Sequence, residues 1–286
     1  MKLTTGFLLA SLSLAAAPNP SFLITTGALE AQLQAKDVVI LHVGSEKDYA
    51  TGHIPGARLV TLADISVTDD KGLRMQLPPT EALVKAFGKL GVTDSSRIVV
   101  YPAGESIQSA TRVWFTLDYL GLSARTALLD GGLILWKAQN RAVSTTPVAP
   151  VEAPATFSVK PNPALVVDAA ALSSAMAGGG IHVVDARLPQ FYSGEDAGGM
   201  PRGGHIPGAL SLPYTSLVNA DRTLKTVTQQ PEPGFTVVTY CHLGMQATVP
   251  YFVARVQGFD VKLYDGSFQD WSARPELPVA PAKAAR

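Results

Sequence analysis

Short runs of apolar, β-branched residues alternate along the chain with longer segments of helical periodicity. Continuous apolar runs of this length are typical of the buried strands of a parallel sheet. The runs are Val38–Val43, Ile98–Tyr101, Ile181–Val184 and Thr236–Tyr240. Helices are predicted over Ala28–Ala35, Thr80–Leu90, Ala169–Ala177 and Ala247–Gln257, with Thr25-Thr26 and Asp168 as N-caps. This alternation predicts an α/β fold with mainly parallel sheets, helices on both faces and ligands at the carboxyl ends of the strands.

An internal repeat divides the chain into two halves. The hexapeptide Gly-His-Ile-Pro-Gly-Ala occurs at Gly52–Ala57 and again at Gly204–Ala209. Further matches, in the same order in both halves, are Ile98–Tyr101 with Val237–Tyr240 and Leu129–Trp136 with Tyr264–Trp271. Such ordered matches predict a duplicated domain. Because His53 and His205 recur within the same turn, we expect both to hold that turn.

The length of 286 residues suits two domains, each with its own core. We expect the first domain over residues 22–146 and the second over residues 164–279. Between them, residues 147–163 are rich in proline and predict a stiff, extended linker. Residues 280–286, rich in alanine and proline, predict a tail.

The first residues have the layout of a secretory signal peptide. Lys2 precedes an apolar run from Phe7 to Ala17 that is too short to span a bilayer. We therefore expect residues 1–17 to be removed and the protein to be exported to the periplasm, with no membrane attachment afterwards. The alternative is an apolar helix packed on the first domain.

Composition narrows the class of partner. Hydrophobic residues make up 47% of the chain and charged residues 16%, as in a globular protein. With 23 basic and 23 acidic residues the chain has no broad charged surface for nucleic acid or anionic lipid. The even balance of charges is more typical of a protein that binds a small-molecule substrate than of one that binds nucleic acid or a lipid surface.

Cys241 is the only cysteine and cannot form an internal disulfide. It directly follows the predicted strand Thr236–Tyr240 and precedes a loop that runs into a predicted helix. Such a loop directs backbone N–H groups at one point, and with the helix dipole these groups favour an anion. A thiolate held there could attack a sulfane sulfur. Burial as an inert apolar thiol is the alternative.

Together these motifs resemble the rhodanese family, whose longer members have two α/β domains in tandem. The matching segments of the second half are Val183–Arg187, Gly204–Ala209, the loop opening at Cys241, and Asp265–Trp271. The resemblance covers nearly all of the chain after residue 17 and implies a sulfurtransferase in which Cys241 carries a persulfide, without a cofactor or metal. The backbone amides implied to hold that persulfide are those of Leu243, Gly244, Met245, Gln246 and Ala247. The implied partners are a small sulfur donor, of thiosulfate or 3-mercaptopyruvate type, and a thiol or cyanide acceptor.

The first half lacks the polar residues of the second. The repeat places Pro102 opposite Cys241, and His42 and Gly44 opposite Asp185 and Arg187. This joint loss predicts that the first domain has no sulfur-carrying site of its own.

Several positions around Cys241 leave alternatives open. Asp185 and Arg187 could brace the cysteine loop or contact substrate, and Ser267 could line the site. The family usually has a donor-binding arginine where this chain has Phe191, so either Arg202 replaces it or the donor differs. His242 could favour the thiolate or point away.

Thiosulfate-type members of the family carry a basic residue after the cysteine and 3-mercaptopyruvate-type members a Gly-Ser pair, whereas this chain has His242-Leu243. The apolar Leu243 suggests a less charged donor. Related phosphatases close a longer cysteine loop with an arginine, but here Gln246 and Ala247 stand at that end. Two further alternatives are a soft-metal site from Cys241, His242 and Met245 and a non-catalytic carrier or scaffold.

Overall fold

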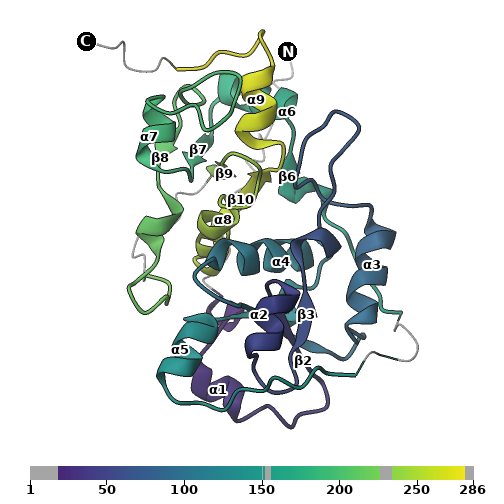
Figure 1. The fold of residues 1–286 in the computed structure, drawn as a ribbon. Helices are drawn as coiled ribbons and strands as arrows, with labels where there is room; N and C mark the ends of the chain where they lie inside the picture. The colour runs from purple at the N-terminus through teal and green to yellow at the C-terminus, as the bar shows by residue number, and fades with distance from the viewer. Residues whose placement is uncertain (1–18, 150, 152–155, 226–233, 281–286) are drawn as a thin grey trace, which may run out of the picture.

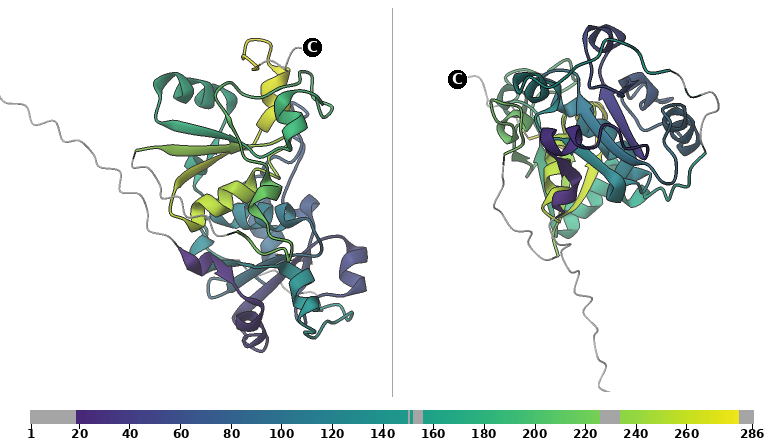
Figure 2. Two further views of the ribbon diagram at one scale, coloured as in Figure 1. Left: turned by 90° about the vertical axis from the view of Figure 1, so that its left-hand side faces the viewer. Right: turned by 90° about the horizontal axis from the view of Figure 1, so that it is seen from below.

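The computed structural model describes residues 19–149, 151, 156–225 and 234–280. In this part of the chain, each half forms a five-stranded sheet in which the strand pairings are parallel (Figure 1). The strand order is β1-β5-β4-β2-β3 in the first sheet and β6-β10-β9-β7-β8 in the second. Helices lie on both sides of the sheets, so the expected α/β fold with two similar domains is confirmed (Figure 2).

The elements have the following bounds. The first sheet contains β1 (Leu23–Ile24), β2 (Val38–Val43), β3 (Arg58–Val60), β4 (Arg97–Pro102) and β5 (Thr126–Leu129). The second contains β6 (Val166–Val167), β7 (Ile181–Asp185), β8 (Leu210–Ser211), β9 (Thr236–Tyr240) and β10 (Asp260–Tyr264). The α-helices are α1 (Thr26–Glu30), α2 (Glu46–Thr51), α3 (Thr80–Lys89), α4 (Ile107–Tyr119), α5 (Gly132–Ala138), α6 (Ala169–Gly178), α7 (Pro189–Ser193), α8 (Thr248–Val256) and α9 (Ser267–Ala273). Short 3-10 helices cover Pro20–Phe22, Leu62–Asp64, Ser123–Arg125, Pro163–Leu165 and Tyr214–Leu217.

The four predicted strands are confirmed, and three of the four predicted helices have nearly the expected limits. The predicted helix Ala28–Ala35 is wrong at its end, because α1 stops at Glu30 and the next residues form turns that lead directly into β2. Both expected N-caps are confirmed. The Thr25 hydroxyl accepts a hydrogen bond from the Ala28 amide at 3.2 Å, and the Asp168 carboxylate accepts one from the Ala171 amide at 2.8 Å.

Residues 1–17, expected to be a signal peptide, lie outside the described residues. Of the expected tail, residues 281–286 also lie outside them, whereas Ala280 pairs with His205 across an antiparallel bridge. Among the described residues, no helix is long and apolar enough to cross a membrane.

The repeated hexapeptide forms the same turn in both domains. His53 and His205 each stack on a tyrosine, Tyr49 and Tyr192, with 3.8 Å between ring centroids. Each histidine Nδ1 also lies 2.9 Å from the carbonyl oxygen of that tyrosine. The expected structural role of both histidines is therefore confirmed.

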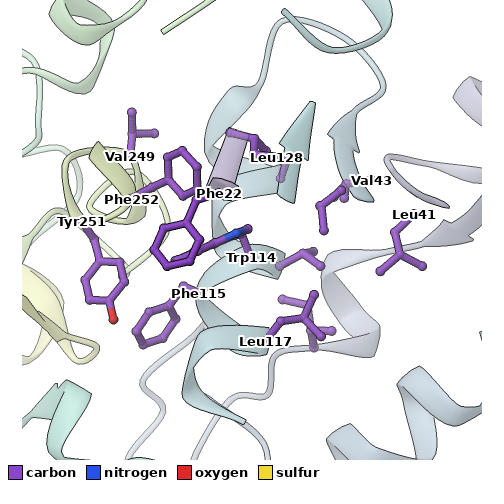
Figure 3. Packing of buried hydrophobic residues seen from close by; sticks show 14 of the residues in the cluster. Phe22, Leu41, Val43, Trp114, Phe115, Leu117, Leu128, Val249, Tyr251 and Phe252 are labelled. Carbon is purple, nitrogen blue, oxygen red and sulfur yellow. The ribbon is translucent and has the colours of Figure 1, made fainter. Parts of the chain in front are cut away.

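Each domain has a hydrophobic cluster of its own, as expected, and a third cluster is shared between the two domains. Helix α4 of the first domain packs on helix α8 of the second, as Figures 1 and 2 show. Trp114 meets Phe252 edge to face at 4.7 Å between ring centroids, and Phe115 meets Tyr251 in the same way at 5.0 Å (Figure 3). The buried cluster around them extends through both sheets and includes Cys241. The cysteine thus lies where the two domains meet.

Candidate active site

Cys241 directly follows β9 and is only 1% exposed. Its backbone is fixed by the first residues of α9. The Cys241 amide donates to the Ser267 hydroxyl at 3.2 Å, and the Phe268 amide donates to the Cys241 carbonyl at 2.9 Å. The Ser267 hydroxyl in turn donates to the Tyr264 carbonyl at 2.9 Å. Ser267 therefore positions the backbone of the cysteine.

The loop after Cys241 curls back toward its sulfur. The Gly244 amide donates to Cys241 Sγ at 3.2 Å. Gly244 has a φ of 85°, and a Cβ there would lie 2.7 Å from the Asp265 carbonyl oxygen, so only glycine fits without a shift. Of the amides expected at the sulfur, Gly244 is the one whose hydrogen bond to Sγ is found among the described residues. Ala247 is the N-cap of α8, whose N-terminus follows the loop.

Asp185 and Arg187 form a buried ion pair below this loop. Arg187 Nε lies 2.9 Å from Asp185 Oδ1, and Nη2 lies 2.5 Å from Oδ2. The same Nη2 donates to the Gly204 carbonyl at 2.7 Å, and the guanidinium stacks over the Phe268 ring at 4.1 Å. Since the pair is enclosed by protein groups, its geometry favours bracing of the site over contact with substrate.

Tyr240 joins this network from the strand that leads to the cysteine. Its hydroxyl donates to Asp185 Oδ2 at 2.6 Å and accepts from the Ile206 amide at 3.1 Å. Burial and the Asp185 carboxylate raise the pKa of Tyr240 well above its usual value, so the hydroxyl keeps the proton that it donates. Through Tyr240, the repeated hexapeptide is hydrogen-bonded to the strand that ends at the cysteine loop.

His242 lies beside the cysteine as a neutral ring. Burial, followed by the positive charge of Arg187, lowers its pKa to about 4. Phe191, which stands where the family arginine is expected, meets the His242 ring edge to face at 4.6 Å between centroids. At neutral pH this pair supplies no positive charge beside the sulfur of Cys241.

The Arg202 side chain forms hydrogen bonds with backbone carbonyl groups at the end of α9 and just after it. Its guanidinium donates to the carbonyl oxygens of Trp271, Ser272, Arg274 and Leu277 at 2.6 to 3.0 Å. It is also absent from the lining of the pocket at Cys241. The geometry therefore indicates that Arg202 supports the structure of the site and does not bind the sulfur donor.

A pocket of about 240 Å³ opens above the sulfur. It is lined by Arg74, Gly198, Met200, Cys241, His242, Leu243, Met245 and Gln246. Arg74 comes from the first domain, on the loop before α3 that reaches across to the second domain (Figure 1). No sequence motif indicates Arg74, because the repeat relates the two halves by similarity and does not show where they are in contact.

Arg112 of α4 is a second residue of the first domain at the cysteine loop. It is fully buried and donates from Nη1 to the Gly244 carbonyl at 3.1 Å and to Asp265 Oδ1 at 2.5 Å. Its Nη2 donates to the Met75 carbonyl at 2.5 Å. The sequence contains no signal for this role, because the segment that forms α4 also contains other polar residues, among them Gln108, Thr111 and Asp118.

The first domain has a different arrangement at the equivalent positions. The strand registers align His42 with Tyr101 and Asp185 with Tyr240, which confirms the correspondence expected from the repeat. His42 Nδ1 lies 3.0 Å from the Tyr101 hydroxyl. Pro102 fills the place of the cysteine, and Gly132 stands where Ser267 does, with a Cβ there only 2.8 Å from Pro102. In the first domain the buried imidazole of His42 thus takes the place of the Asp185–Arg187 ion pair.

This buried histidine predicts acid sensitivity. Burial, the largest cause, and the charge of His53 lower the pKa of His42 from 6.5 to about 4, so the unfolded chain binds a proton more readily than the folded one. The free energy of unfolding should be independent of this group above pH about 6.5 and fall as the pH drops from there toward 4. His42→Asn should reduce that fall by on the order of 2 kcal/mol, measured by urea unfolding across this range. His242 should supply the remaining slope, and an unchanged slope in the variant would contradict the prediction.

Comparisons with known proteins agree with this geometry. A Rhodanese-like domain model matches residues 25–139 and again residues 168–274. The thiosulfate sulfurtransferase of Azotobacter vinelandii is 32% identical over 260 residues, which cover 88% of this chain and 94% of that protein. The 3-mercaptopyruvate sulfurtransferase of Escherichia coli is 32% identical over 250 residues, which cover 83% and 86%. The similarity thus extends over both domains.

Solved structures share the fold. The anaerobic ergothioneine biosynthesis enzyme from Chlorobium limicola has a TM-score of 0.78 at 20% identity and matches 91% of this chain and 71% of its own. YnjE has a TM-score of 0.79 at 23% identity, with 92% and 69% covered. At these identities the likeness concerns the fold alone. The family model and the curated relatives carry the assignment: the chain belongs to the rhodanese family and is a sulfurtransferase with two rhodanese-like domains.

Proposed function

We propose that the protein takes a sulfane sulfur from a small donor of thiosulfate or 3-mercaptopyruvate type, carries it as a persulfide on Cys241, and passes it to a thiol or cyanide. The observation that supports this most directly is the Gly244 amide 3.2 Å from Sγ, at the base of a pocket of about 240 Å³. An amide aimed at sulfur stabilises a thiolate and, after transfer, the persulfide anion. The curated relatives include enzymes named for each donor.

Two displacements at sulfur make up the proposed cycle. In the first, the Cys241 thiolate attacks the outer sulfur of thiosulfate, an S–S bond forms, and the bond to the oxidised sulfur breaks with its electron pair leaving as sulfite. With 3-mercaptopyruvate, the C–S bond breaks instead and the carbon takes a proton to give pyruvate. In the second, a thiolate or cyanide attacks the outer sulfur, and the Cys241 thiolate leaves.

Intact-mass measurement tests the proposal. Incubation with thiosulfate and, separately, with 3-mercaptopyruvate should add the mass of one sulfur atom to the protein, and cyanide or a thiol should remove it. The donor with the higher second-order rate of loading is the better substrate. A protein that gains no mass with either donor would be a scaffold rather than a sulfur carrier.

A soft-metal site has one observation in its favour, since Cys241, His242 and Met245 all line the same pocket. In the described part of the chain, no three residues among His, Cys, Asp and Glu are grouped to hold a metal ion. Titration with monovalent copper, followed by the loading assay, separates the two functions: a metal protein should bind one equivalent through Cys241 and gain no sulfur.

We also propose export to the periplasm. The support is the apolar run Phe7–Ala17 ending in three alanines. N-terminal sequencing of protein recovered from the periplasmic fraction should give a start at Ala17 or Pro18, whereas a start at Met1 in the cytoplasmic fraction would contradict export.

A further inference from the structure

The pocket above Cys241 has one permanently charged side chain in its lining, and it comes from the other domain. Arg74 is that residue, because His242 is neutral at pH 7 and no other lining residue has a basic side chain. Phe191 lies against His242 in place of the arginine that the resemblance would have placed in the second domain. The cationic contribution to this pocket therefore depends on the arrangement of the two domains.

The backbone of Arg74 is held firmly against the catalytic half. The Arg74 amide donates to Gln269 Oε1 at 3.1 Å, and Gln269 Nε2 donates to the Arg74 carbonyl at 2.8 Å. The backbone amide of Gln269 in turn donates to the His242 carbonyl at 3.0 Å, so this one residue of α9 joins the Arg74 loop to the cysteine loop. The next residue, Met75, has its carbonyl bound by Arg112. These contacts fix the backbone of Arg74 beside the cysteine loop.

The guanidinium of Arg74, by contrast, is exposed, and no described residue forms an ion pair or hydrogen bond with it. The carboxylate of this network, Asp265, is already paired with Arg112 and also accepts the Leu77 amide at 2.9 Å. The backbone of Arg74 is held in place while its guanidinium has no partner, so this guanidinium is suited to bind an anion that enters the pocket.

We infer that Arg74 binds the oxyanion of the sulfur donor and makes the enzyme selective for anionic sulfane compounds. The inference rests on the proposed persulfide function. With thiosulfate, Cys241 attacks the outer sulfur while Arg74 holds the sulfonate oxygens, and the electron pair of the broken S–S bond leaves with sulfite on that side of the pocket. The less charged donor suggested by Leu243 is then not required, because the charge comes from the first domain.

Loading rates of Arg74→Gln test this role. Removal of one charged hydrogen-bond donor should lower the second-order rate of loading by thiosulfate about 30-fold, mainly through a higher KM. Loading by methanethiosulfonate, which has one negative charge instead of two, should fall less, by about fivefold. Arg74→Lys keeps the charge without the planar fork and should lie between the wild type and Arg74→Gln.

Two controls separate binding of the donor from damage to the site. Lys71→Gln removes a positive charge from an exposed position on the same loop and should change loading less than twofold. Removal of the persulfide sulfur by 2-mercaptoethanol, an acceptor with no charged group other than its thiolate, should proceed at the wild-type rate in preloaded Arg74→Gln.

The outcomes are distinct. Equal loss with both donors, or a matching loss of discharge, would assign Arg74 a structural role and overturn the inference. Wild-type loading in Arg74→Gln would overturn it as well. A wild-type protein that gains no sulfur from any donor would instead overturn the proposed function.

Discussion

Cys241→Ser will abolish the gain of one sulfur atom from thiosulfate and from 3-mercaptopyruvate. Cys241 is the only cysteine, and a serine hydroxyl is almost fully protonated at neutral pH and cannot form a persulfide. Turnover should fall by on the order of a thousandfold or more. Because serine is close to cysteine in size and the site holds its backbone through Ser267 and Phe268, the fold should be retained. Intact mass after incubation, beside a thermal unfolding curve, checks both parts.

The duplicated domain offers a matched control. Pro102→Cys in the Cys241→Ser protein places a thiol at the equivalent strand end of the first domain, where Gly132 replaces Ser267. We expect this thiol to load at least about a hundredfold more slowly than Cys241. Equal loading at both positions would show that any thiol at such a strand end reacts, and would remove the role given to the Gly244 loop.

Arg112→Met will cost the protein about 3 to 5 kcal/mol of unfolding free energy. The side chain is fully buried, and its loss leaves the Asp265 carboxylate without its ion-pair partner and the carbonyl oxygens of Gly244 and Met75 without a donor. Sulfur loading should also fall about tenfold, since the Gly244 amide that faces Sγ belongs to the same turn. Urea denaturation and the loading assay measure the two effects.

Arg141→Met is the comparison on the surface. Arg141 pairs with Glu30, whose side chain is 48% exposed, so its removal should cost less than about 1 kcal/mol. A double-mutant cycle of Arg112→Met with Asp265→Asn should show a coupling above about 1 kcal/mol. Additive effects, or a loss in Arg112→Met as small as that in Arg141→Met, would contradict the interdomain role.

The sequence predicted those features that depend on residues close together in the chain. Cys241, the turn at Gly244 and the start of α8 belong to one strand, loop and helix segment, and the strands β4 and β9 coincide with apolar runs in the sequence. The repeat supplied the correspondence of Pro102 with Cys241, which the strand registers confirm.

The features that the sequence did not predict depend on packing between the halves. No pattern indicates that Arg74 and Arg112, distant in sequence from Cys241, meet its loop, because their position follows from the packing of α4 on α8. Nor does the sequence reveal that four backbone carbonyls occupy the guanidinium of Arg202. Side-chain partners of this kind are decided by the folded backbone.

The core shared by α4 and α8 limits how this protein can be divided. A fragment that begins near residue 164 would keep Cys241, Ser267 and the whole second sheet, yet it would present Tyr251 and Phe252 to water. It would also lose Arg74, which lines the pocket, and Arg112, which binds the Gly244 carbonyl of the cysteine loop. We therefore expect the half that contains Cys241 to be inactive as a separate domain, and engineering of this enzyme has to treat both halves as parts of one site.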